Sequence, residues 1–360
     1  MKLHNLLIYM AVLTSIPAMG QTTQKLTANK LSEYGLIYSL PLTGINVTVE
    51  VECTQKTPGQ FYQYAKKYLG EQPITESSKV YTLKSVVVTP TAVADDEESY
   101  LVQFKSGSTP FMMLDGGNFP LSINTEAVSI PQQTQLPVAK AAEPSILDMP
   151  IARQAVTEEM MQSPSSAKRA ELAAARIFEL RASRADIIAG RADQMPSDGT
   201  AMQLALDNLG AQEAALTAMF LGTTQTSTEV RTYNYLPDGS DSQELIVARI
   251  SSLKGAVDAT DLSGAPLYMR LTATEHGQLP VNEKGKEKEF PKGGLAYCIP
   301  GSGVVSLSFN GNEVASQKLD IAQFGVVFGL DPNLFTDKKE PAYAIFNPFT
   351  GAIREIGTVK

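Results

Sequence analysis

Tryptophan is absent from this chain of 360 residues, and histidine and cysteine each occur only twice. Metal centres and activated nucleophiles draw most of their ligands and bases from His and Cys. Their scarcity argues against multi-histidine metal sites, so no metal and no cofactor are expected. Basic residues are also in the minority, with 30 against 38 acidic ones and a net charge of −8. Nucleic acid is not an expected partner, because it requires a basic surface.

Long apolar runs are missing too, with one exception at the start of the chain. Lys2 precedes an apolar stretch over 3–19, which ends in Ala18-Met19-Gly20. A charged start, a short apolar core and two small residues spaced by one predict a cleaved secretory signal peptide over 1–20. The core is shorter than the roughly 20 residues of a membrane span, so no transmembrane segment is expected after its removal. We therefore expect export to the periplasm, the outer membrane or the exterior.

Strand patterns dominate the first part of the remaining chain. Apolar and polar residues alternate from Ile45 to Cys53, which predicts a half-buried antiparallel strand with Cys53 facing the core. Thr57-Pro58 and the later Gly70 predict a helix over about 58–69. The acidic run Asp95–Glu98 is interpreted as a solvated loop tip. Further strands are expected near 80–89, 99–105, 111–114 and 119–123.

The middle of the chain has a helical composition. A Pro-rich connector over 131–150 leads to a helix from Ala167 to Ala189, and a second helix begins at Thr200. Apolar stripes at three-four spacing predict that the two helices form an αα-hairpin. Folding back would bring Glu213 near Arg176 or Arg181. Asp193 and Asp198 in the intervening loop could hold a cation, but loop and capping roles explain them better.

Strand patterns resume from Thr228 to the end of the chain. Asn310-Gly311 between two strand patterns predicts a tight β-hairpin. The charged segment 282–289 is interpreted as a solvated loop. The expected strands are 228–236, 243–253, 266–274, 294–300, 303–309, 313–321, 324–330, 342–347 and 352–357.

These patterns predict an α+β fold that is mainly β, with antiparallel β-sandwich-like modules flanking a central helical hairpin. The expected order is a signal peptide (1–20), an N-terminal β-rich domain with one helix (21–130), the connector (131–150), the αα-hairpin (151–222) and a C-terminal β-sandwich-like domain (223–360).

One segment is echoed within the chain. Residues 35–45 align without gaps on 294–304, sharing Gly, Leu, Tyr, Pro and Gly at matching positions. Two related β modules would explain the echo, and so would convergence on one hairpin pattern, because repeats normally run to about 20 residues or more.

Few residues offer chemistry. Cys53 and Cys298 would sit in an oxidising compartment, where either a disulfide or two separate buried thiols fit the sequence. His276, the only histidine left after signal removal, lies at a strand end and is interpreted as a surface residue. Leu40-Pro41-Leu42-Thr43-Gly44 matches a sortase signal as a string, but a strand follows it directly, so the match is taken as coincidental. No residue stands out as catalytic, and no binding residue can be named.

Several segments together resemble one known family. They are Leu31–Pro41, Phe61–Ala65, Gly190–Gly199, Gly294–Pro300, Ala322–Gly325 and Phe346–Pro348. In these segments the chain resembles a family of secreted proteins of Bacteroidota whose function is unassigned, and the resemblance covers most of the mature chain. It implies an envelope location and no catalytic residue. Members of that family often carry a basic residue where this chain has Cys298, so a shared role of that position does not follow.

The favoured function is therefore a binding or structural role in the cell envelope, with a protein or an envelope polymer as partner. We expect the chain not to be an enzyme. The alternative is a glycosidase-like hydrolase that uses two carboxylates on an envelope or dietary polymer. A homodimer through the helical hairpin is a further expectation.

Overall fold

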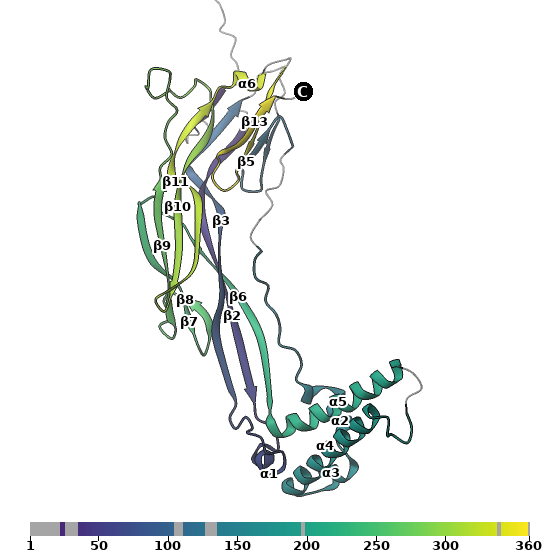
Figure 1. Cartoon of the computed structure of the whole chain (residues 1–360). Helices are drawn as coiled ribbons and strands as arrows, with labels where there is room; N and C mark the ends of the chain where they lie inside the picture. The colour runs from purple at the N-terminus through teal and green to yellow at the C-terminus, as the bar shows by residue number, and fades with distance from the viewer. Residues whose placement is uncertain are drawn as a thin grey trace, which may run out of the picture.

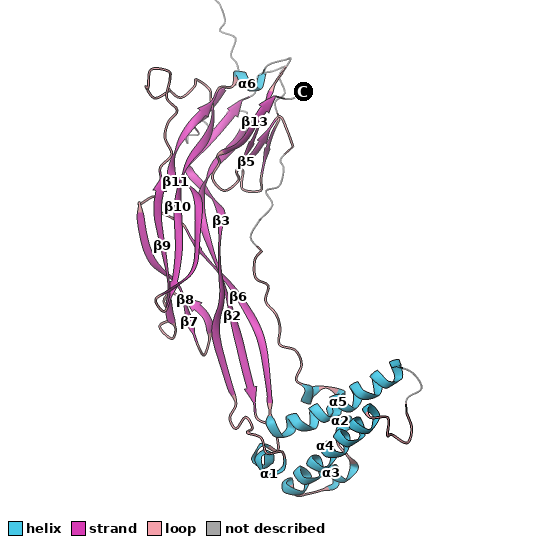
Figure 2. Cartoon of the chain, viewed as in Figure 1, coloured by secondary structure: helices cyan, strands magenta, loops and turns pink. Residues whose placement is uncertain are grey.

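The computed structural model describes residues 22–25, 35–103, 111–126, 135–195, 199–336 and 340–358. Within these residues the chain is mainly β and its sheets are antiparallel, as the alternating patterns predict. Three sheets form an elongated body, and all but one short helix gather at one end of it (Figures 1 and 2).

The first sheet has the strand order β1-β3-β2-β6. Three of its strands are long, and β-branched residues alternate with polar ones over much of their length. Strand β3 spans the two strands predicted near 80–89 and 99–105. The acidic run Asp95–Glu98 lies within its bounds, at a register irregularity that leaves these four residues unpaired on β2, and Asp96 and Glu97 are exposed there. The prediction missed that Glu98 is held by Lys25 and by the Tyr100 hydroxyl, which makes an acidic residue tolerable there. The strands are β1 (Thr22–Lys25), β2 (Leu36–Thr57), β3 (Ser78–Gln103) and β6 (Thr223–Tyr235).

The second sheet has the order β11-β10-β9-β7-β8. Asn310 and Gly311 join β10 to β11 with φ values of 50° and 80°, so the predicted Asn-Gly hairpin is confirmed. The strands are β7 (Ser242–Ser251), β8 (Gly255–Asp258), β9 (Ala265–Glu275), β10 (Leu295–Phe309) and β11 (Asn312–Leu330).

A third, small sheet brings together segments from both halves of the chain, in the order β13-β12-β5-β4. A short helix, α6 (Asn333–Thr336), precedes β12. The strands are β4 (Met112–Leu114), β5 (Pro120–Ile123), β12 (Ala342–Phe346) and β13 (Ile353–Thr358).

Two apolar cores lie along the body, and β2 contributes to both. Tyr38 and Leu40 belong to the core beside the small sheet. Further along the same strand, Ile45 to Cys53 supply every second residue to the core shared by the first and second sheets. The echoed segments occupy similar positions, because each opens a long strand (β2 or β10) with a register irregularity beside its proline.

The remaining helices form a helical head at the opposite end of the body from the small sheet (Figure 1). Its core joins α4 and α5 to residues around Phe61. Ser165 caps α4, its hydroxyl accepting a bond from the Lys168 amide. The elements are η2 (Tyr62–Tyr64), α1 (Ala65–Tyr68), η3 (Ile146–Asp148), α2 (Pro150–Ala155), α3 (Glu158–Gln162), α4 (Ser166–Ile188) and α5 (Gly199–Leu221).

The helix predicted over 58–69 is shorter than expected and consists of η2 and α1. The residues before η2 are not helical and contact α5 instead. The Phe61 amide donates a 2.7 Å hydrogen bond to the Met219 carbonyl at the end of α5. Gly59 lies so close to that carbonyl that an added Cβ would be 2.3 Å from it. The segment therefore anchors the head to the body.

At the junction of α5 and β6 the head joins the body directly. Gly222, with φ of 86°, is the single residue between α5 and β6. The Leu221 carbonyl accepts a bond from the Ile74 amide, and a Cβ on Gly222 would meet the Thr57 carbonyl oxygen at 2.4 Å. Contacts on both sides of Gly222 thus fix the direction in which β6 leaves the head.

The ion pair expected for Glu213 forms with one of the two arginines named for it. Arg181 Nε lies 2.6 Å from the carboxylate, and Arg184 adds a second contact at 2.9 Å. Arg176 instead pairs with Glu179 on its own helix. Glu213 therefore ties α5 to α4.

Candidate functional site

The largest of the cavities described lies at the open end of the space between the first and second sheets, on the side of the β10–β11 turn. Its volume is about 620 Å³. We call it the mouth groove. Its apolar floor continues the main core, and its rim carries hydroxyl and amide groups. It is lined by Tyr81, Thr82, Leu83, Ile250, Ser252, Ser263, Ala265, Phe309, Asn310, Asn312 and Val314.

Tyr81 is the residue of the groove that connects it to the rest of the body. Its ring is buried, and its hydroxyl donates a 2.9 Å hydrogen bond to Glu229 on β6. Its amide donates to the Ser252 carbonyl, which fixes the β7–β8 turn beside the groove. Gly255 in this turn has φ of 81°, and a Cβ there would lie 3.1 Å from the Tyr81 ring. The wall of the groove is therefore set by backbone contacts.

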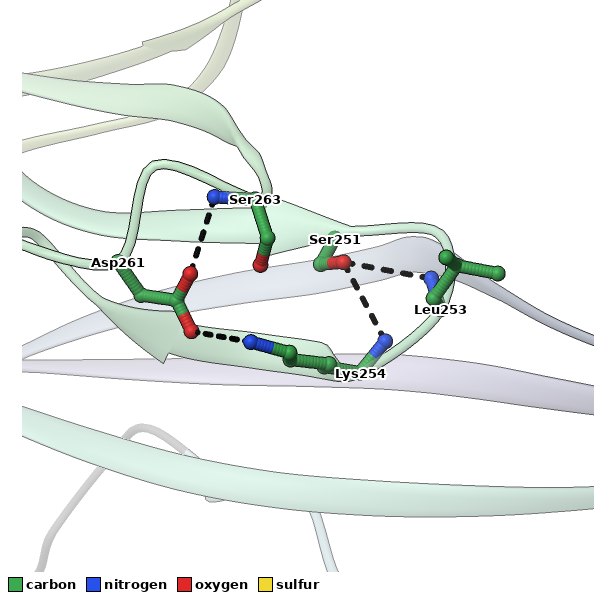
Figure 3. A network of polar contacts seen from close by, with 5 residues as sticks. All are labelled: Ser251, Leu253, Lys254, Asp261 and Ser263. Atoms are coloured by element: carbon green, nitrogen blue, oxygen red, sulfur yellow. Dashed lines mark hydrogen bonds and ion pairs between the residues drawn. The ribbon is translucent and has the colours of Figure 1, made fainter.

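A polar network stiffens the two turns next to the groove (Figure 3). The buried Ser251 hydroxyl accepts from the amides of Leu253 and Lys254, each at 3.3 Å. Lys254 Nζ lies 2.9 Å from Asp261, whose other oxygen accepts from the Ser263 amide at 2.9 Å. These contacts hold the pKa of the Asp261 carboxyl well below its usual range, with the Lys254 hydrogen bond as the largest cause. The Lys254–Asp261 pair thus links the β7–β8 turn to the loop before β9.

Two leucines sit at the tips of these stiffened turns. Leu253 is 76% exposed and Leu262 is 80% exposed. Figure 3 shows the Leu253 side chain pointing away from the network. Single exposed apolar residues are common on protein surfaces. Here, however, each is adjacent in sequence to a residue of the Lys254–Asp261 ion pair and to a serine, Ser252 or Ser263, that lines the groove.

The hydrolase alternative needs two carboxylates facing each other across a cleft. Among the described residues, none of the four cavities is lined by more than one carboxylate. The mouth groove has no carboxylate in its lining. Glu213, in a cavity of the head, is already engaged by two arginines. These four cavities of the described residues therefore offer no pair of carboxylates.

No cation site forms from the residues that the structure describes, where no group of three His, Cys, Asp or Glu side chains comes together. Asp198, one of the two loop acids considered for a cation, lies outside those residues. His276 is half-exposed, pairs with Asp241 at 3.0 Å and packs edge-on against Phe324. The sequence expectation of a surface histidine fits this position.

The two cysteines are buried and free in this structure. The Cys298 thiol lies 3.8 Å from the Ala322 carbonyl, and the Ala322 amide bonds to Thr43 on β2. Cys53 follows Thr43 by ten residues of extended strand, which is roughly 33 Å at about 3.3 Å per residue. A disulfide needs Cα atoms within about 7 Å. In this structure Cys53 and Cys298 are therefore two separate buried thiols. Burial raises the pKa of the Cys298 thiol to about 12.

Two other sequence features have structural explanations. The string Leu40–Gly44 lies inside β2, paired on β3, so it is not presented as a sorting signal would be. The apolar stripes that predicted a dimer through the helices are used within the head, where Ile177, Leu180 and Phe220 are almost fully buried. Among the described residues, no helix combines the length and apolar character needed to cross a membrane.

Sequence reasoning missed the mouth groove and its two turns. Leu253 ends the strand expected over 243–253, and Leu262 lies outside every expected strand. The available signals are Ser251 and Asp261. The side chain of each accepts a hydrogen bond from the backbone amide two residues later, as is typical of turns.

Comparison with known proteins gives a family and no function. No curated protein matches the chain. No solved structure matches it either. A family model described as a domain of unknown function (DUF4831) matches residues 34–354, which include the body, the head and the connector between them. The chain therefore belongs to the DUF4831 family.

Proposed function

We propose that this chain is an exported cell-envelope protein with a binding role and no catalytic one, and that it binds a protein partner at the mouth groove. The observation that carries the proposal is the pair of leucines displayed on stiffened turns beside an apolar groove. Covering exposed aliphatic side chains with apolar surface lowers the free energy of the complex. A rigid display reduces the entropy that binding must remove.

A protein partner is favoured over an envelope polymer by the composition of the groove. Glycan sites present aromatic faces to the sugar rings together with polar groups. In the mouth groove Tyr81 is 7% exposed, and next to the groove the two leucines are large apolar residues that are 76% and 80% exposed. Apolar tips of this kind suit an apolar patch on another protein.

The proposal includes an architecture that supports this role. We infer that the first and second sheets form a sandwich, because residues of β2 and β3 share one core with residues of β7, β9, β10 and β11. We further infer that α4 and α5 form a helical hairpin inserted between the connector and β6, supported by the Glu213 contacts and the shared core of the head. The domain boundaries given from the sequence belong to the same proposal.

Export is tested by cell fractionation of the full-length chain. Because of the signal-like segment over 1–20, we expect the protein in the periplasmic or membrane fraction, with a mass reduced by about that segment. Recovery of the uncleaved chain in the cytoplasm would contradict the localisation.

Binding is tested with matched leucine variants. Leu253→Ser combined with Leu262→Ser removes both apolar tips, and Leu204→Ser makes the same change on the head, where that residue is 70% exposed. Cross-linking in isolated envelopes is expected to capture a protein with the wild type and with Leu204→Ser, and to lose it with the double variant. Equal capture by all three proteins would refute the mouth groove as the binding site, and capture of a glycan polymer instead would refute the protein partner.

A further inference from the structure

The edges of the three sheets differ in how well they are protected. An unpaired strand edge presents amide and carbonyl groups that can bind another strand, and proteins guard such edges by keeping them short, bulged, covered or rich in Pro and Lys. Four of the six edge strands here, β1, β4, β8 and β13, have between three and six residues. Strand β11 is long, but it has two register irregularities and lies against β2 and β3.

Strand β6 has none of these protections over its second half. It runs for 13 residues, and its register with β2 is unbroken from Tyr235 to Thr223. It contains no Pro, Gly or Lys. In Figure 1 it forms the side of the body that faces the connector.

The connector shows that this edge accepts an antiparallel strand. Lys140 and Thr228 exchange two backbone hydrogen bonds, of 3.1 and 2.8 Å. Before Lys140 the connector leaves the edge, and Val138 is 82% exposed. Because alternate residues of a strand point their backbone groups to the same side, the amides and carbonyls of Val230, Thr232 and Asn234 face the open edge. Among the described residues, these groups have no partner on that side.

We propose that β6 pairs with β6 of a second copy of this chain through residues 229–235, across a two-fold axis at Thr232. The two first sheets then become one continuous antiparallel sheet of eight strands. This inference rests on the strand edge alone and does not depend on the proposed function.

Two of the alternative registers are disfavoured. An axis at Val230 would need the backbone of Thr228, which Lys140 already occupies. An axis at Arg231 would place two arginines directly opposite each other, which is unfavourable.

An axis at Thr232 avoids both problems. It pairs Thr232 with its own equivalent and Val230 with Asn234 of the second copy, and these are the residues whose backbone groups point outward. Between them, Arg231 lies opposite Tyr233 of the second copy, so that a cation faces an aromatic ring. The Tyr233 hydroxyl is buried without a hydrogen-bond partner in the described structure.

The test uses charge at the axis. In the dimer, Thr232→Glu places two carboxylates opposite each other, and Thr232→Lys places two ammonium groups there. Thr226→Glu is the matched control, because Thr226 is also exposed, lies on the same face of β6 and falls outside the proposed pairing. Light scattering over a concentration series is expected to give a dimer for the wild type and for Thr226→Glu, a monomer for each Thr232 variant, and a dimer again when Thr232→Glu and Thr232→Lys are mixed.

Three results would overturn the proposal: a wild type that stays monomeric at every concentration, a Thr232→Glu variant that stays dimeric, or a Thr226→Glu variant that dissociates equally. Circular dichroism checks that the variants fold. A second measurement does not rely on them: Thr232→Cys treated with a short bis-maleimide is expected to give a covalent dimer, and Thr226→Cys is expected to give none. The two native thiols are buried and do not interfere.

Discussion

Thr43 is fully buried, and its side chain joins three segments that are far apart in the sequence. Its hydroxyl donates to the Phe349 carbonyl at 2.9 Å and accepts from the Ala322 amide at 3.0 Å. The side chain of Gln323 completes the contact by bonding to the Thr43 backbone. One hydroxyl thus connects β2, β11 and the turn before β13.

Thr43→Val is expected to destabilise the chain by about 2–4 kcal/mol, because two buried backbone groups lose their partner while the side-chain volume stays the same. Urea unfolding followed by circular dichroism measures the change. Thr43→Ser keeps the hydroxyl and is expected to cost much less. Equal losses in the two variants would show that the methyl group, rather than the hydroxyl, is responsible.

Glu50 gives a prediction for pH. Hydrogen bonds from Lys84 and Ser85, at 2.9 and 2.7 Å, hold the pKa of its carboxyl below the usual value. The ionised form therefore stabilises the fold above a pH of about 4.3, and this contribution is lost as the pH falls further. Glu50→Gln is expected to cost about 1 kcal/mol at pH 7 and much less near pH 3. Unfolding of both proteins at the two pH values measures the difference, and a cost that does not change with pH contradicts the assignment.

The cysteines are expected to react only when the chain unfolds. Alkylation without reductant should add nothing to the native protein, because both thiols are buried, and should add two adducts in denaturant. Mass spectrometry reads the result. A denatured, unreduced chain that takes up no adduct would show that a disulfide is present after all.

At the scale of elements, the joint between α5 and β6 depends on a glycine. Gly222→Ala is expected to cost at least about 3 kcal/mol, because it combines an unfavourable backbone conformation with a Cβ placed 2.4 Å from the Thr57 carbonyl. Gly190→Ala is the control: its φ of 66° is similar, but nothing lies within 4 Å of the added Cβ, so a cost of about 1 kcal/mol is expected. Thermal unfolding compares the loss of stability in the two variants. Similar losses would mean that the Thr57 carbonyl can move away from the added Cβ.

Elements with local signals could be predicted from the sequence. The alternation in Ile45–Cys53 and the Asn310-Gly311 turn each define their structure within a few residues, and both are confirmed. The continuity of β3 could not be predicted, because it is set by pairing with β2 and β1, and no local pattern in β3 encodes those partners. The shortened helix near Phe61 likewise reflects a bond to Met219 that no local pattern encodes.

The mouth groove was beyond sequence reasoning for the same reason. Its walls come from β3, β7, β9 and the β10–β11 turn, and only the pairing of these strands brings Tyr81 next to Ile250 and Phe309. The two leucines are recognisable as apolar residues in the sequence, but their exposure of 76% and 80% follows from the positions of their turns in the fold.

The whole molecule is elongated, and this has a direct test in solution. Strand β2 has 22 residues, which corresponds to roughly 70 Å of extended chain, and the head adds to that length at one end (Figure 1). A compact chain of this size has a radius of gyration near 20 Å. Small-angle X-ray scattering of the monomeric Thr232→Glu variant is expected to give a clearly larger value. A value near 20 Å would mean that the head folds back on the body.

Because β2 supplies side chains to both cores, the two ends of the body are parts of one mechanical element. The strands of the first sheet run along the length of the body, and β2 pairs with β3 from Leu36 to Lys56. Tension between the head and the small sheet would therefore act along these strands and load many hydrogen bonds together in shear, instead of opening them one after another. A chain built in this way would keep its length under a pulling force, as a tether between two anchored points must.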